Sequence, residues 1–195
     1  MNILVDRLPT KVHISGEDYS ADTDFRTALS IILAFEDMDL TREEKCMIML
    51  DLFYIDHPKE DIKGAIDMAI KFLNCGESDS DSVGGNPAPP RRLYSFEKDA
   101  KYIYSAIKQS HGVDLEAVDY LHWWKFCYMF ADLREDCFFH KMIYLRKQKQ
   151  IGKLSKEEAQ AYAQMKDVLD LPKQYTTEEL EEMEEVKRIL GIEVI

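Results

Sequence analysis

The sequence lacks the motifs by which most enzymes and metal proteins are recognised. It has no glycine-rich phosphate loop, no HExxH zinc motif and no GxSxG nucleophile motif. Its 4 cysteines show no CxxC spacing and lie within apolar helical patterns, which predicts reduced, buried thiols rather than disulfides or metal ligands. No stretch approaches the roughly 20 apolar residues of a membrane span, and no basic leader precedes an apolar run. We therefore expect a cytoplasmic protein without membrane contact.

Glycine and proline are also scarce, with 8 and 6 residues, whereas Leu, Lys, Glu, Ala and Met recur. This composition predicts a mostly helical fold, and the 46% of hydrophobic residues suffices for a buried core. The chain has 25 basic and 37 acidic residues, which give a net charge of −12. A general nucleic-acid-binding protein is therefore unlikely by charge, since it needs a positive surface for phosphates.

A change of composition divides the chain into two predicted helical lobes. Residues 77–92 combine Ser, Asp, Gly and Pro with few sizeable apolar side chains. Such a segment cannot bury enough surface to offset the entropy of ordering it. We interpret it as a flexible acidic, Pro- and Gly-containing linker between a lobe at 1–76 and a lobe at 93–195, or as a long loop on one domain.

Local signals place the first elements of the amino-terminal lobe. Ile3–Val5 and Val12–Ile14 are short β-prone pieces, which predict a short β-hairpin or three short strands. Asp22 or Thr23 can cap the first helix. Pro58 suits the first turn of a third helix, where its missing N–H leaves no hydrogen bond unmade.

Capping signals mark further helices along the chain. Thr41 and Ser155 each begin a capping box, in which the hydroxyl and a glutamate three residues later satisfy free N–H groups. Ser95 can cap the first helix of the second lobe, and an apolar pattern predicts the next helix over residues 119–133. A last helix is predicted to begin near Thr176.

The stretch from Leu121 to Arg146 holds the greatest concentration of aromatic side chains in the chain. Its first helix is apolar nearly all round, which predicts a central position in the fold. Core packing is the simplest interpretation, because aromatic side chains bury large areas. Adjacent tryptophans on one helix point in different directions and cannot both be buried on the same side. We therefore expect one of them to face a neighbouring helix or a partner chain. The candidate partner contacts are Trp123, Trp124 and Tyr128.

Residues 141–156 contain six positive side chains and no acidic one. This pattern fits a site for nucleic acid or another anionic partner, and it equally fits favourable charge at a helix end. Residues 178–185, EELEEMEE, provide an acidic counterpart for docking within or between chains. We take Arg146, Lys147 and Lys149 as a candidate electrostatic edge, which would steer the register of a complex rather than hold it.

Histidine supplies only a weak metal signal. Asp136 and Cys137 each lie about one helical turn from His140, but a second ligand pair at matching spacing is lacking. Paired carboxylates are common in any acidic chain and indicate no active site by themselves. We therefore expect no metal, no cofactor and no enzymatic activity.

The order of several motifs resembles the bacteriophage gene-product-fifteen family. These motifs follow a β-prone start and are TDFRTAL (residues 23–29), LTREEK (40–45), FEKDAKYIYSAI (96–107), GVDL (112–115), LHWWKF (121–126) and YLR (144–146). An acidic linker lies between the second and the third. The resemblance covers nearly the whole chain, and LHWWKF with DAKYIYSAI is its most specific part.

The resemblance implies a gene in the tail module of phages and prophages, between the tail-tube and tape-measure genes. That position is typical of tail-assembly chaperones, which bind the long helical tape-measure protein and keep it soluble until tube subunits polymerise around it. The function so implied is a non-enzymatic chaperone in the bacterial cytoplasm, with other tail proteins or a second copy as further partners. The alternatives are a structural component of the mature tail and, as a minor one, a nucleic-acid-binding regulator using residues 141–156.

Overall fold

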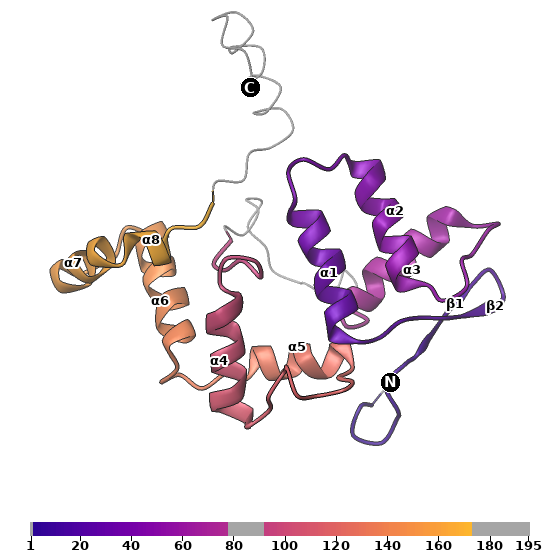
Figure 1. Cartoon of the computed structure of the whole chain (residues 1–195), viewed down its shortest axis with the longest axis horizontal. Helices are drawn as coiled ribbons and strands as arrows, with labels where there is room; N and C mark the ends of the chain where they lie inside the picture. Colours follow the sequence, from indigo (N-terminus) through magenta and orange to yellow (C-terminus); the bar gives the residue numbers. More distant parts are fainter. Residues whose placement is uncertain (1, 78–91, 173–195) are drawn as a thin grey trace, which may run out of the picture.

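The computed structural model describes residues 2–77 and 92–172 and shows a mostly helical protein with a small β-hairpin (Figure 1). The hairpin and α1–α3 form one group, α4 and α6–α8 form another, and α5 lies between them. Most of the predicted linker and the whole predicted last helix lie outside the described residues. No helix in the two described ranges is long and apolar enough to cross a membrane.

The predicted hairpin is confirmed. Strands β1 (Lys11–Ile14) and β2 (Glu17–Ser20) pair antiparallel, and Ser15 and Gly16 turn the chain between them with φ angles of 49° and 95°. The prediction of a strand at Ile3–Val5 is wrong, because the backbone turns there and the Val5 N–H donates to the Asn2 carbonyl oxygen.

Helices α1 (Phe25–Glu36), α2 (Arg42–Phe53) and α3 (Ile62–Leu73) follow. The capping box at Thr41 is confirmed. The first cap is Asp24 rather than Asp22 or Thr23, because its carboxylate accepts from the Arg26 N–H at 2.9 Å. The placement of Pro58 in a first turn is also wrong: Asp61 caps α3, accepting from the third residue of that helix.

The second group contains α4 (Ala100–His111), α5 (Trp123–Ala131), α6 (Phe138–Gln150), α7 (Lys156–Gln164) and α8 (Lys166–Leu169). The capping box at Ser155 is confirmed. Ser95 caps the turn that precedes α4, since its hydroxyl accepts from the Lys98 N–H at 3.2 Å. Helix α5 begins later than predicted, because the Leu121 carbonyl oxygen and the Trp123 N–H form backbone hydrogen bonds with Phe25 and Thr23 instead of helical ones.

A junction between residues 23–25 and 121–123, here called the junction, joins the two groups. The Phe25 N–H donates to the Leu121 carbonyl oxygen at 2.9 Å, and the Trp123 N–H donates to the Thr23 carbonyl oxygen at 2.7 Å. The Asp24 carboxylate, besides capping α1, accepts from the Leu121 N–H at 3.1 Å. The amino-terminal ends of α1 and α5 are therefore fixed against each other.

The two tryptophans strengthen this contact at the carboxyl end of α3. Their indole N–H groups donate to consecutive carbonyl oxygens, from Trp123 to Leu73 and from Trp124 to Phe72, both at 2.8 Å. The last carbonyl groups of a helix have no partner within it, so the Trp123 indole satisfies a free acceptor at Leu73, whereas the Phe72 carbonyl oxygen accepts from the Cys75 N–H as well as from Trp124. The side chains are 3% and 7% exposed, respectively.

A buried ion pair holds the second group together. The Arg146 guanidinium on α6 donates twice to the Asp99 carboxylate just before α4, at 2.6 and 2.9 Å. It also donates to the carbonyl oxygens of Leu93, Val168 and Leu169. Both side chains are at most 3% exposed, so the ion pair is shielded from solvent. The network connects three segments that are far apart in sequence.

We predict that Asp99→Ala lowers the free energy of unfolding by about 3–5 kcal/mol, because it leaves a buried guanidinium without its counter-charge. Urea denaturation followed by tryptophan fluorescence measures the loss. The matched control is Asp136→Ala, which breaks the exposed pair with Arg134 at 2.7 Å and should leave the urea midpoint nearly unchanged. Equal losses in the two variants would contradict this account of the ion pair.

His122 makes the junction sensitive to acid. Its Nε2–H donates to the Pro9 carbonyl oxygen at 2.9 Å, and its Nδ1 accepts from the Trp124 N–H at 3.1 Å, which caps α5. This arrangement requires the neutral ring, and burial lowers the pKa of His122 below its usual 6.5. A proton on Nδ1 would remove the acceptor and place positive charge at the amino end of a helix.

We predict that stability contributed by His122 is complete above pH 6.5 and is lost as the pH falls through the lower folded-state pKa. The reason is that the unfolded chain binds the proton more readily than the folded one. His122→Asn keeps an acceptor for the cap and should flatten the dependence of the urea midpoint on pH between about 5 and 7. His13→Asn, at an exposed ring, serves as the control; a wild-type slope retained in His122→Asn would refute the assignment.

Candidate functional site

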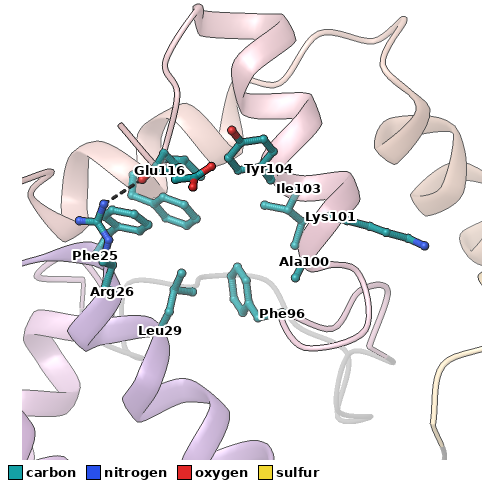
Figure 2. A pocket seen from close by; sticks show the side chains of 11 residues that line it. Phe25, Arg26, Leu29, Phe96, Ala100, Lys101, Ile103, Tyr104 and Glu116 are labelled. Carbon is teal, nitrogen blue, oxygen red and sulfur yellow. Dashed lines mark hydrogen bonds between the residues drawn. The ribbon is translucent and has the colours of Figure 1, made fainter. Parts of the chain in front are cut away.

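A cavity of about 440 Å³ opens between α1, α4, α5 and the loop after α4 (Figure 2). We call it the α1–α4 cleft. Its lining draws on both groups of helices, so the cleft exists only because the junction brings them together. The lining residues are Phe25, Arg26, Leu29, Phe96, Ala100, Lys101, Ile103, Tyr104, Leu115, Glu116 and Phe126.

Aromatic rings form much of the wall of the cleft. The rings of Phe25 on α1 and Phe126 on α5 stack with centroids 5.2 Å apart and an interplanar angle of 11°. Phe96, in the turn before α4, lies with its ring centroid 6.4 Å from that of Phe126. Leu29 follows Phe25 by one helical turn and extends the same apolar face along α1.

Arg26 fixes one side of the opening. Its guanidinium donates to the carbonyl oxygens of Leu115 and Val118, at 2.8 and 2.7 Å, and lies 4.5 Å from the centroid of the Phe25 ring. The loop after α4 is thereby attached to α1. Figure 2 shows Arg26 at the edge of the cleft and the Lys101 side chain extending away from it.

One lining residue, Tyr104, is bonded to a charged pair outside the lining. The Lys108 ammonium lies 2.8 Å from the Asp114 carboxylate, and the Tyr104 hydroxyl donates to the same carboxylate at 2.6 Å. These two hydrogen bonds lower the pKa of Asp114 to about 2, with Lys108 the larger cause. The bond to Asp114 raises the pKa of Tyr104. The cleft therefore offers mainly apolar surface, and this suits apolar side chains of a ligand.

Two of the sequence-predicted contact residues are buried beneath the surface. Trp123 and Trp124 lie in the core and do not line the cleft. Both face a neighbouring helix rather than a partner chain, because their indole N–H groups donate to carbonyl oxygens at the carboxyl end of α3. Tyr128 is 38% exposed and lies outside the cleft lining. A role of these three residues in partner binding stays a prediction.

The three residues of the predicted electrostatic edge do not share one exposed surface. Arg146 is buried in its ion pair with Asp99 and therefore does not belong to a surface edge. Lys149 is exposed but paired with Asp170 at 2.7 Å, and its ammonium lies 4.1 Å from the centroid of the Tyr162 ring. Lys147 is exposed. A contribution of Lys147 and Lys149 to partner binding is untested.

The prediction of buried thiols holds only for Cys137, since Cys46, Cys75 and Cys127 are half-buried. None of the 4 cysteines forms a disulfide, and the Cys137 thiol caps α6 by accepting from the His140 N–H at 3.4 Å. The thiols of Cys75 and Cys127 are hydrogen-bonded to each other, which lowers the pKa of Cys75 and raises that of Cys127. Residues 2–77 and 92–172 contain no group of three or more His, Cys, Asp or Glu side chains placed to hold a metal ion.

The sequence predictions missed the cleft as a site. Phe25, Leu29, Phe96 and Ile103 stand out as apolar positions of separate helices, but nothing local shows that they share one cavity. Leu115 lies in a loop, where a single leucine carries little signal. The motifs TDFRTAL, FEKDAKYIYSAI and GVDL contain most of the lining residues, so the only available signal was their joint presence in the family pattern.

Comparison with known proteins agrees with this pattern. The model of the family described as Bacteriophage Gp15 protein matches residues 4–171, which include every residue of the cleft. No curated protein and no solved structure matches the chain. Because the family match extends over most of the chain, the protein belongs to the Bacteriophage Gp15 family.

Proposed function

We propose that the protein is a non-enzymatic tail-assembly chaperone that binds the phage tape-measure protein through the α1–α4 cleft. The family membership indicates a phage structural or tail-related protein. The observation that carries the finer proposal is the cleft itself, an open, mainly apolar cavity of about 440 Å³. Its mainly apolar lining suits the side chains of a helical client.

The lining suits a helix rather than a flat surface. An amphipathic helix presents large apolar side chains at spacings of three and four residues, and these can enter a hydrophobic groove. The walls of the cleft are two helices and an aromatic floor, and such walls accept apolar side chains without requiring hydrogen-bond partners. A tape-measure protein, as the family resemblance implies, is long, helical and partly apolar.

The cleft supports binding better than catalysis. Its titratable side chains are Arg26, Lys101, Tyr104 and Glu116. Arg26 is engaged by backbone carbonyl groups, and Tyr104 is bonded to Asp114. No nucleophile with an adjacent base is present in this lining, and that arrangement is what covalent or general acid–base chemistry requires. The net charge of −12 would help to keep a loaded complex dissolved in the cytoplasm.

The direct test is co-expression with the tape-measure protein of the same phage or prophage. The proposal requires that co-expression raises the soluble fraction of the tape-measure protein and that the two proteins co-purify. Unchanged solubility together with the absence of a complex would exclude the chaperone function.

A variant in the cleft tests the site. Ala100 lines the cleft and is exposed, so Ala100→Trp fills the cavity without disturbing the core. We predict that this substitution weakens binding of the tape-measure protein by about tenfold or more, because it displaces apolar contacts of about 1.5–3 kcal/mol. Isothermal titration or a pull-down with quantified bound fraction measures the change.

The matched control is Ser105→Trp, on the same helix and exposed but outside the lining. It should bind the client as the wild type does. Equal binding by Ala100→Trp and the wild type would show that the client uses a different surface, even if a complex forms.

A further inference from the structure

One face of α6 exposes apolar and basic side chains together. Phe138, Tyr144 and Ile151 are 42%, 46% and 51% exposed, respectively. Lys141, Tyr144, Lys147 and Ile151 lie on one side of the helix, because residues three and four apart are neighbours on a helix surface, whereas Phe138 lies on the opposite side from Lys147. We call Lys141, Tyr144, Lys147 and Ile151 the α6 face. A cavity of about 520 Å³ at its amino-terminal end is lined in part by Phe138, Lys141 and Tyr144.

The two lysines of the α6 face have no ion-pair partner within residues 2–77 and 92–172. They stand out in a chain whose net charge is −12. The positive neighbours in the same helix differ from them, since Arg146 is paired with Asp99 and Lys149 with Asp170. The α6 face therefore fits a ligand that combines negative charge with apolar side chains.

The chain itself contains a segment of this kind. Residues 178–190 read EELEEMEEVKRIL, in which Leu180, Met183 and Val186 recur at three-residue spacing and glutamates fill the positions between them. We propose that this segment binds the α6 face of its own chain. Its apolar side chains contact Tyr144 and Ile151, and its glutamates lie beside the two lysines.

The connection is long enough for this contact. The chain approaches its described end beside α6, where the Leu169 carbonyl oxygen accepts from Arg146 at 2.6 Å and Asp170 pairs with Lys149 at 2.7 Å. The six residues from 172 to 178 can span roughly 20 Å when extended. Helix α6, with 13 residues, is itself about 20 Å long. The acidic segment can therefore reach every part of the α6 face.

The charges select the register and the apolar side chains supply most of the affinity. Exposed ion pairs contribute little by themselves, whereas removal of apolar area from water is favourable. Glu135 at the beginning of α6 repels glutamates, and so does Glu158 on α7, which accepts from the Tyr144 hydroxyl at 2.9 Å. The glutamates of the acidic segment are therefore directed to Lys141 and Lys147, and their binding neutralises these two lysines.

Zero-length carbodiimide cross-linking of the full chain tests the proposal, because it couples a lysine amine only to a carboxylate in contact with it. We expect cross-links from Lys141 and Lys147 to glutamates of residues 178–185. The pair Lys149–Asp170, at 2.7 Å, is the internal positive control, and the exposed Lys63 and Lys71 on α3 are negative controls. An equimolar mixture of ¹⁴N- and ¹⁵N-labelled protein distinguishes contacts within a chain from contacts between chains.

A double variant tests whether apolar contact, rather than proximity alone, produces the cross-links. Leu180→Asp combined with Met183→Asp should reduce the cross-links to Lys141 and Lys147 about tenfold, because it removes the apolar contact. The Lys149–Asp170 cross-link should persist in this variant. Three results would overturn the proposal: no cross-link at the α6 face, cross-links unaffected by the double variant, or cross-links found only between ¹⁴N and ¹⁵N chains.

Discussion

The junction between residues 23–25 and 121–123 is the contact on which the rest of the structure depends. It joins positions 97 residues apart, and closing a loop of that length costs about 4 kcal/mol of chain entropy beyond a constant. Burying two tryptophans, at about 200 Å² each and about 25 cal/mol per Å², contributes about 10 kcal/mol. The aromatic contact therefore exceeds the entropic cost, and the short backbone hydrogen bonds then define the register.

The cleft follows from this junction. Phe25 and Leu29 are carried by the helix that starts at the junction, whereas Phe126 is carried by the other helix that starts there. Arg26 then holds the loop after α4 against α1 through two carbonyl oxygens. The buried Asp99–Arg146 pair fixes α4 relative to α6 and so keeps the second wall in place. The cleft, which spans both halves of the chain, thus rests on a few polar contacts between distant segments.

The sequence was most informative where two or more neighbouring residues form one specific motif, and less so where a single residue was the signal, as with Pro58. The hairpin and the capping boxes at Thr41 and Ser155 are confirmed, because a cap depends on a hydroxyl and a glutamate three residues apart. The start of α5 was predicted too early, because residues 121–123 take backbone partners from a distant segment. The position of Arg146 was misjudged for the same reason, because Asp99 is a partner that only the tertiary fold supplies. The core position of the tryptophans was predicted, but their bonds to the end of α3 were not.

The central claim is that a helical client binds the cleft formed by the two halves together. Hydrogen–deuterium exchange of the protein, free and in complex with the tape-measure protein, tests it most directly. The account predicts that binding slows exchange jointly in α1, in α4 and in residues 113–118, which line or border the cleft. Protection confined to α6 and α7, or no protection in any of these segments, would contradict it.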